Sequence, residues 1–309
     1  MKHILLIGKM GQVGQELQKT LVSLGKVTAM GHEELDLTQP EQIRMAIGQN
    51  QPDLVVNAAA YTAVDKAESE PELAWTINAE APKVMAEEAQ RLGAGLIHIS
   101  TDYVFDGRQN TPYTETDATN PVSVYGRSKL AGEVEISQIY ARSPELSYGI
   151  LRTAWVYGCY GKGNFVKTML RLGGDREEVR VVADQVGSPT WAAEIAGAIA
   201  VLSQNALDQV QQPESNLPIV NGLYHFTNSG VASWYDFAVA IFEEAQLLGF
   251  PLKLKTVVPI TTAEYPTPAK RPAYSVLANQ KISTLLKTPT AHWRQALRLM
   301  LTELHTELH

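Results

Sequence analysis

The sequence predicts a doubly wound α/β fold, in which helices cover both faces of a parallel sheet. Short apolar runs alternate with longer helical patterns over the first half of the chain, and these runs are continuously apolar. Strands that are buried on both faces have this composition, because helices pack on either side of them. A glycine-rich turn directly after the first run agrees with the same architecture.

The expected elements follow one another in a regular order. In the first half we expect strands at 4–7, 27–30, 54–56, 96–99 and 148–157, with helices at 15–24, 72–92 and 124–140. In the second half we expect a polar loop at 209–218, a helix at 231–248 capped by Ser233, a Pro-rich segment at 259–272 and a last helix at 291–304. The alternation loosens after residue 158. The sequence therefore predicts a dinucleotide-binding Rossmann domain in residues 1–158 and a smaller, interleaved substrate lobe in residues 159–309.

Composition excludes several classes of protein. The 309 residues are 45% hydrophobic and 19% charged, as in ordinary globular proteins. The net charge of −7 argues against a nucleic-acid or acidic-membrane partner. The single cysteine, Cys159, allows no internal disulfide and suits a reducing compartment. With no apolar run of about 18 residues, we expect a cytoplasmic protein.

Three glycines in the first strand-to-helix turn predict a dinucleotide site. Small residues let the backbone approach a pyrophosphate, and the helix N-terminus offers unpaired N–H groups and a partial positive charge. The alternative is a tight turn that needs glycine only for its backbone conformation. The residues expected to contact the cofactor in this turn are Gly8, Met10, Gly11, Gln12, Val13 and Gly14.

The second expected strand lacks the acid that selects NAD. That acid usually binds the ribose hydroxyls, but here Gly31 and His32 follow the strand, and no arginine replaces the acid. We therefore expect NADPH, with NADH also usable. Asp36 and Leu37 are expected beside the adenine, although a helix-capping loop explains them equally well. The end of the third strand is expected to border the cofactor through Ala59, Ala60 and Tyr61.

Tyr125 and Lys129 are four residues apart, so on a helix their side chains share one face. A phenol has a pKa near 10, and a nearby ammonium group lowers that pKa. Tyr125 is then able to give a proton to a carbonyl oxygen as hydride reaches the carbon, while Lys129 binds the nicotinamide ribose. The hydroxyl of Thr101, at the end of the fourth expected strand, can hold the same oxygen. The alternative is a solvated helix face.

The glycine turn, Thr101, Tyr125 and Lys129 together resemble the extended short-chain dehydrogenases/reductases. Within them, segments 57–68, 100–107, 152–157 and 265–272 are similar to the dTDP-4-dehydrorhamnose reductases, and the resemblance covers nearly the whole chain. It implies NAD(P)H-dependent reduction of the C4 ketone of dTDP-4-dehydro-L-rhamnose, the last step of dTDP-L-rhamnose synthesis. The family roles fall on Tyr125 as proton donor, Lys129 as its activator and Thr101 as polariser of the ketone.

The resemblance also implies residues for the sugar nucleotide. Asp102 and Trp155 match positions associated with it. Arg271, in the Pro-rich segment, is expected at the diphosphate because guanidinium suits phosphate oxygens, with a surface arginine as the alternative. Related dehydratases carry Asp-Glu after the strand-end threonine, whereas here Tyr103 follows Asp102. The missing glutamate favours a reductase over a dehydratase.

The resemblance leaves a metal in doubt. Some family members bind Mg²⁺ through glutamates at a dimer contact, one of them directly after a tryptophan near the C-terminus. In this chain Arg294 follows Trp293, and arginine does not ligate a cation. Glu16 and Glu194 remain as acids for such a site. We therefore expect no tightly bound metal, and a monomer or weak homodimer.

Two other functions stay open at this stage. One is a non-catalytic binding protein that resembles the regulatory subunit of methionine adenosyltransferase, which shares the fold and similar motifs. The other is a reductase or epimerase that acts on a different nucleotide sugar.

Overall fold

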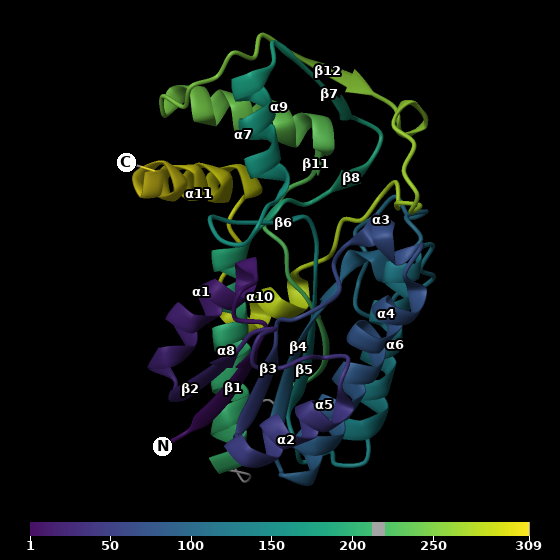
Figure 1. Ribbon diagram of the computed structural model, residues 1–309, viewed down its shortest axis with the longest axis vertical. Helices are drawn as coiled ribbons and strands as arrows, with labels where there is room; N and C mark the ends of the chain where they lie inside the picture. Colours follow the sequence, from purple (N-terminus) through teal and green to yellow (C-terminus); the bar gives the residue numbers. More distant parts are fainter. Residues whose placement is uncertain (212–219, 309) are drawn as a thin grey trace.

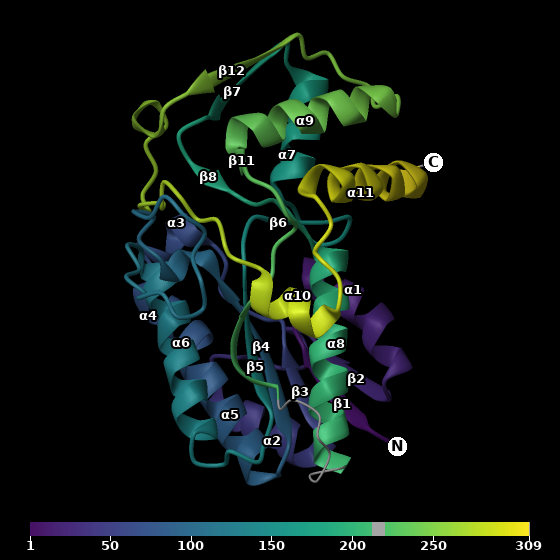
Figure 2. The same cartoon turned by 180° about the vertical axis from the view of Figure 1, so that it is seen from behind.

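The computed structural model describes residues 1–211 and 220–308. A six-stranded sheet forms the larger lobe, and a smaller lobe of helices and short strands lies beyond one end of it (Figures 1 and 2). All neighbouring strands of the sheet are parallel, which confirms the predicted doubly wound fold. The strand order is β10-β5-β4-β3-β1-β2, with β1 at His3–Ile7, β2 at Lys26–Met30, β3 at Leu54–Asn57, β4 at Gly95–Thr101, β5 at Tyr148–Thr153 and β10 at Asn221–His225.

Helices bury both faces of this sheet. Alternate residues of β1 point to opposite sides, so Ile4 belongs to one hydrophobic core and Leu5 to the other. The first core includes α1 (Gln12–Thr20), which continues into a short 3₁₀ turn, and α8 (Ala192–Gln211). The second core lies against α2 (Pro40–Asn50), α5 (Ala81–Arg91) and α6 (Val124–Tyr140). Two buried faces explain why the strands are continuously apolar.

The strand order places a crevice at the carboxyl ends of β1 and β3. From β1 the chain goes outward to β2 and then returns across β1 to β3, so the order reverses between β1 and β3. Ligands of open α/β sheets bind at such a switch point. The glycine turn follows β1 there, and Ala59 and Ala60 follow β3.

The long helix expected over 72–92 is divided by a π turn. It consists of α4 (Pro71–Trp75), the π turn Thr76–Glu80 and α5. Within the π turn, the side chain of Asn78 accepts a hydrogen bond from Tyr61 N and donates to Ser128 Oγ on α6. A Cβ on Gly132 of α6 would lie 2.2 Å from the carbonyl oxygen of Asn78. The absence of a side chain at Gly132 lets α6 lie this close to the π turn.

The strand expected over 148–157 is interrupted. Trp155 has a φ of 49°, a left-handed conformation that a strand cannot contain. The chain therefore leaves the sheet after β5 and forms a separate strand, β6 (Val156–Tyr157), which pairs in parallel with β9 (Thr190–Trp191). The bend directs the chain into the smaller lobe.

The smaller lobe has its own hydrophobic core, built on three helices. Ser233 caps α9 through a reciprocal hydrogen-bond pair with Asp236, as the sequence predicts. The α8, β10 and α10 segments return to the sheet, so the chain is interleaved between the lobes (Figures 1 and 2). The helices of this lobe are α7 (Phe165–Asp175), α9 (Trp234–Leu247) and α11 (Trp293–Leu308). Its strands are β7 (Glu178–Val182) paired with β12 (Thr256–Ile260), and β8 (Val186–Gly187) paired with β11 (Ala232–Ser233). Helix α10, which lies against the sheet, spans Gln280–Leu286.

Two expected segments differ in detail. Helix α8 runs to Gln211, so the polar loop expected at 209–218 begins as helix, and its residues 212–218 lie outside the described residues. The Pro-rich segment 259–272 begins in β12 and includes a 3₁₀ turn at Thr262–Glu264. Among the described residues, no helix combines the length and apolar character that a membrane span requires.

Candidate active site

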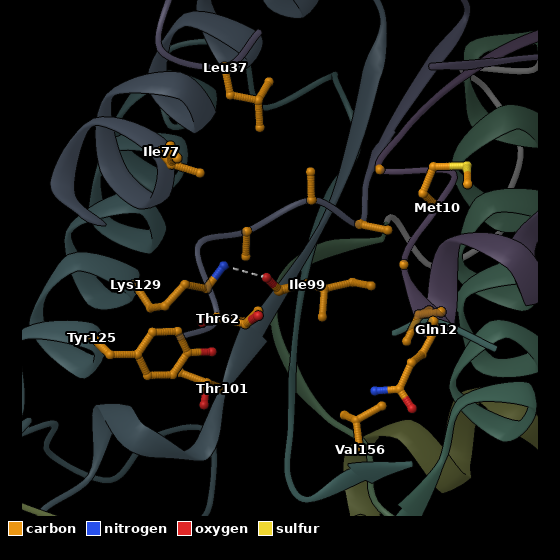
Figure 3. Close-up of a pocket in the computed structure, with 18 of the residues that line it drawn as sticks. Met10, Gln12, Leu37, Thr62, Ile77, Ile99, Thr101, Tyr125, Lys129 and Val156 are labelled. Carbon is orange, nitrogen blue, oxygen red and sulfur yellow. Dashed lines mark hydrogen bonds between the residues drawn. The ribbon is translucent and has the colours of Figure 1, made fainter. Parts of the chain in front are cut away.

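A pocket with a volume of about 960 Å³ follows the carboxyl ends of the strands from the glycine turn to α6 (Figure 3). Its size lies at the upper end of the range for small-molecule and cofactor pockets. Most of the predicted site residues line it, namely Gly8, Met10, Gly11, Gln12, Val13, Asp36, Leu37, Ala59, Ala60, Thr101, Asp102, Tyr125, Lys129 and Trp155. Gly14, Tyr61 and Arg271 are not among the lining residues.

The glycine turn forms a cradle that side chains would fill. Gly8 has a φ of +96°, and a Cβ there would lie 2.6 Å from Ala59 N. A Cβ on Gly14 would lie 2.0 Å from the oxygen of Gly8, so Gly14 allows helix α1 to start close to the turn. Gly11 is the N-cap of α1, and no side chain caps the helix. Free N–H groups at a helix N-terminus facing a pocket fit the pyrophosphate of a dinucleotide.

The far end of the pocket is bordered by Gly31 and His32, which follow β2. Glu34 accepts a hydrogen bond from Gly31 N at 2.8 Å and pairs with Lys9 at 2.5 Å. Asp36 accepts hydrogen bonds from the backbone N–H and the hydroxyl of Thr38, at 2.9 and 2.8 Å. These bonds close a turn ahead of α2, but the N-cap of that helix is Gln39 and no side chain caps it, so Asp36 does not cap the helix; Asp36 lines the pocket.

Tyr125 lies in the first turn of α6, near Thr101 at the end of β4 (Figure 3). Ser123 caps this helix by accepting a hydrogen bond from Gly126 N at 3.1 Å. A Cβ on Gly126 would lie 2.2 Å from Tyr103 O, so the helix start is pressed against the turn after β4. Burial raises the pKa of Tyr125 to about 12, although the Thr101 hydroxyl opposes this. The phenol is thus protonated at neutral pH, as a proton donor must be.

Lys129 projects into the pocket one turn beyond Tyr125 (Figure 3). Its Nζ atom donates to Ile99 O at 2.7 Å and lies 3.0 Å from Nε2 of His98. Burial lowers the pKa of Lys129 to about 8, while the charge of Glu133 acts in the opposite direction. Burial raises the pKa of Tyr125, so the lowering of that pKa which the Tyr-Lys spacing predicts is not found here.

Three buried oxygen atoms at this end of the pocket have no hydrogen-bond partner among the described residues. They are Ser100 Oγ, Asp102 Oδ2 and Thr153 Oγ1, and all three residues line the pocket. Burial raises the pKa of Asp102 to about 6. Unpaired polar atoms are costly unless a ligand satisfies them.

Trp155 forms the wall of the pocket on the side of the smaller lobe. Its indole stacks on that of Trp234, with ring centroids 3.5 Å apart and planes 3° from parallel. A Cβ on Gly187 would lie 2.5 Å from the Trp155 ring. The left-handed backbone and this tight packing fix the ring at the pocket. Strain held in this way is common at functional sites.

Tyr61 and Arg271 are engaged elsewhere. The Tyr61 hydroxyl donates to Glu70 at 2.6 Å. The Arg271 guanidinium donates to both carboxylate oxygens of Asp65, at 3.0 and 2.7 Å. These contacts link the segment after β3 to the Pro-rich segment. The predicted contacts of Tyr61 with the cofactor and of Arg271 with a diphosphate remain predictions.

Sequence reasoning missed a loop of the smaller lobe that lines the pocket, Gly161-Lys162-Gly163-Asn164. Asn164 Nδ2 donates to Gln12 Oε1 at 2.8 Å, which ties this loop to the glycine turn. Gly161 has a φ of +79°, and a Cβ there would lie 2.9 Å from the Gln12 side chain. Two glycines around a lysine, directly before the N-cap of α7, were the available signal. It was too general to place the loop across the pocket.

The acids considered for a metal lie apart from this pocket. Glu16 pairs with Lys19 at 3.3 Å, and burial raises the pKa of Glu194. Arg294 binds Glu243 and Glu244 through its guanidinium. Within residues 1–211 and 220–308, no group of three or more His, Cys, Asp or Glu side chains is arranged to hold a metal ion.

Comparison with known proteins places this geometry in a family. Residues 1–306 match the family model described as the RmlD substrate binding domain. The chain belongs to this family. It is 45% identical over 309 residues to the dTDP-4-dehydrorhamnose reductase of Escherichia coli K12, with 98% of each chain covered. It is 43% identical over 303 residues to that of Burkholderia thailandensis, with 97% and 98% covered. These findings confirm the resemblance stated from the sequence.

Solved structures agree with the family assignment. The dTDP-4-dehydrorhamnose reductase of Bacillus anthracis, solved in complex with NADP, is 36% identical, with a TM-score of 0.85 and 98% and 100% of the two chains covered. A UDP-glucose 4-epimerase from Thermus thermophilus, at 20% identity and a TM-score of 0.77 over 98% and 99% of the chains, shares the fold. The chain thus shares its fold with this epimerase and is similar in sequence to the dTDP-4-dehydrorhamnose reductases.

Proposed function

We propose that this chain reduces the C4 ketone of dTDP-4-dehydro-L-rhamnose with NADPH, giving dTDP-L-rhamnose. One observation carries the proposal. A single pocket has a phosphate-binding glycine cradle at one end and a protonated Tyr125 beside Thr101 and Lys129 at the other. The relatives named dTDP-4-dehydrorhamnose reductase, at 40–45% identity over nearly full length, support the choice of substrate.

The glycine cradle and the ends of β2 and β3 would hold the cofactor. NADP in the B. anthracis relative supports NADPH, as does the absence of an acid at the end of β2 in this chain. NADH remains usable in this proposal. When bound, the nicotinamide supplies the hydride that the reduction needs. Lys129 lies where it can bind the nicotinamide ribose, and the Gly161–Asn164 loop closes over the cradle.

Tyr125 acts as the proton donor in this proposal. Its buried phenol keeps its proton at neutral pH and gives it to the ketone oxygen as negative charge develops there. The Thr101 hydroxyl accepts a hydrogen bond from Tyr103 N at 3.2 Å and donates to Asp102 Oδ1 at 3.1 Å, so it orients the ketone oxygen by turning that proton away from Asp102. Only one proton is required, so the site needs no second acid. The Thr101-Asp102-Tyr103 sequence agrees with this requirement.

The sugar occupies the end of the pocket with the unpaired oxygens. Ser100, Asp102 and Thr153 accept or donate hydrogen bonds to its hydroxyls, and Trp155 packs against the ring or the base. Arg271 is paired with Asp65. Its guanidinium would bind the diphosphate directly only after this ion pair opens. The protein acts as a monomer or weak homodimer and requires no metal in this proposal.

The test is a direct assay with dTDP-4-dehydro-L-rhamnose and NADPH, following the loss of absorbance of the reduced nicotinamide. Turnover with this substrate, and at least tenfold less with UDP- or GDP-linked 4-keto sugars, is the expected result. Turnover only with another nucleotide would favour a different reductase or epimerase. No turnover with any ketone, together with tight binding of a protein partner, would favour the non-catalytic regulatory function.

A further inference from the structure

A lysine at the edge of the pocket has no part in the function proposed above. Lys162 belongs to the loop between β6 and α7, is exposed, and lines the pocket together with Gly161 and Gly163. Within residues 1–211 and 220–308, its ammonium group makes no hydrogen bond and no ion pair. An unpaired cation that faces a pocket suits a negatively charged ligand.

The loop is anchored on both sides of this lysine. Asn164 Nδ2 donates a hydrogen bond to Gly158 O at 2.8 Å. The ammonium group of Lys167, on α7, donates to Gly161 O at 3.5 Å. The backbone that carries Lys162 is therefore held in place before any ligand binds. Such a loop loses less conformational entropy when its side chain engages a ligand than a free loop would.

The same loop lies against the start of α1. A Cβ on Gly161 would lie 2.9 Å from the Cγ atom of Gln12 and 3.4 Å from its backbone nitrogen. Gln12 is the first residue of α1 and directly follows the N-cap Gly11. Because consecutive Cα atoms are about 3.8 Å apart, Lys162 is carried next to this contact. Its charge is thus available at the glycine cradle.

The proposed cofactor would bring two negative charges to this cradle, one on each phosphate of its pyrophosphate. The glycine turn itself offers only N–H groups. Among the described residues that line the pocket, Lys129 and Lys162 are the only lysines or arginines. Lys129 donates to Ile99 O at 2.7 Å and lies on the side of the pocket opposite Gln12 (Figure 3). Lys162 is therefore the cation placed to neutralise the pyrophosphate.

We propose that Lys162 binds the pyrophosphate of the dinucleotide from the smaller lobe. The inference rests on the proposed function for the presence of this cofactor. The pyrophosphate does not change during hydride transfer, so this contact contributes equally to the ground state and the transition state. Loss of the charge should therefore raise KM for NADPH and leave kcat unchanged.

Binding measurements on ligand-free protein test this inference. Lys162→Met removes the charge and keeps the length of the side chain, whereas Lys162→Arg keeps the charge. Lys26→Met is the matched control, because Lys26 is exposed at the start of β2, at the amino end of the sheet. Each variant is titrated with NADPH and NADH by nicotinamide fluorescence and with dTDP by calorimetry. Thermal unfolding of each variant checks that the exposed substitution leaves the fold intact.

We expect Lys162→Met to bind NADPH and NADH about tenfold more weakly, by the same factor for both, because they share the pyrophosphate. Affinity for dTDP should change less than twofold. Lys162→Arg and Lys26→Met should both stay within threefold of the unmodified chain for every ligand.

Three results would overturn the proposal. A loss for NADPH alone would place the lysine at the 2′-phosphate, and a loss for dTDP alone would place it at the sugar nucleotide. A change of less than threefold for all ligands would mean that it binds no phosphate. Turnover is not measured, so a chain that binds NADPH but reduces no ketone would refute the proposed function and leave this inference standing. An active chain whose NADPH affinity is unchanged in Lys162→Met would refute this inference alone.

Discussion

The side chain of Asn164 joins the two lobes by donating from Nδ2 to Gln12 Oε1 at 2.8 Å. Gln12 belongs to the glycine turn of the sheet domain, and Asn164 begins α7 in the smaller lobe. The same asparagine donates to Gly158 O and caps α7 by accepting from Lys167 N at 3.0 Å. A cofactor bound in the cradle is therefore held between segments that are about 150 residues apart in the chain.

Removing this link should weaken cofactor binding. Asn164→Ala loses both the contact with Gln12 and the helix cap, so we expect a several-fold weaker affinity for NADPH and a loss of about 1 kcal/mol of stability. Gln12→Ala removes only the contact. Fluorescence titration with NADPH and thermal unfolding separate the two effects. A double variant whose affinity loss equals the sum of the single losses would show that the two side chains do not act together.

Tyr125→Phe should retain cofactor binding and lose turnover. The phenol is the only group placed here as proton donor, and loss of a positioned acid lowers kcat by roughly 10²-fold or more. Assays of kcat with the dTDP-linked ketone and of NADPH affinity check this. Tyr235→Phe, on α9 and outside the pocket lining, is the matched control. Unchanged kcat in Tyr125→Phe would remove this residue from the chemistry.

The sheet, the glycine turn and the Tyr125–Lys129 helix follow from local patterns and could be predicted. Features that depend on contacts between distant segments could not. The bend at Trp155 looks like continuous strand in the sequence, because its left-handed conformation is imposed by packing against Trp234. His98 resembles any core residue of a strand, since only the structure brings it to Lys129. Neither feature has a signature at short range.

Gly187→Ala should raise KM for the sugar nucleotide without changing the affinity for NADPH. The added methyl group would lie 2.5 Å from the Trp155 ring, which cannot yield because it is stacked on Trp234. We expect a KM increase of at least fivefold and a destabilisation of about 1–3 kcal/mol. Gly197→Ala, where the new methyl group meets nothing within 4 Å, is the control. Steady-state kinetics with each substrate varied in turn tests this prediction. An equal increase in KM for the sugar nucleotide and for NADPH would contradict it.

The buried pair of Arg152 and Glu133 should matter far more for stability than any surface pair. Both side chains are almost completely buried, and the guanidinium donates to both carboxylate oxygens at 2.6 to 3.1 Å. Glu133→Gln leaves the arginine charge uncompensated, at a cost of about 3–5 kcal/mol. Glu41→Gln, which breaks an exposed pair with Arg44, should cost less than about 1 kcal/mol. Denaturant unfolding of both variants tests the contrast.

Asp102 should make the protein less stable as the pH rises from about 4 to 6. Its pKa is raised by burial from 3.8 to about 6, so between these values the folded chain holds a proton that the unfolded chain has released. Stability falls with pH wherever the folded state binds more protons. The penalty is absent below about pH 4 and complete above about pH 6, and a shift of this size corresponds to roughly 3 kcal/mol.

Asp102→Asn removes this titration. The difference in unfolding free energy between the variant and the unmodified chain should therefore grow in favour of the variant across the same pH range and stay constant above it. Asp106→Asn is a useful comparison. Hydrogen bonds from Asn120 and Arg108 N help to lower the pKa of Asp106 despite partial burial. The contribution of Asp106 to the unfolding free energy should therefore rise with pH, whereas that of Asp102 falls. A difference for Asp102→Asn that is flat from pH 4 to 7 would mean that this carboxyl titrates normally. The unpaired Oδ2 atom would then be hydrated and less available to a sugar hydroxyl.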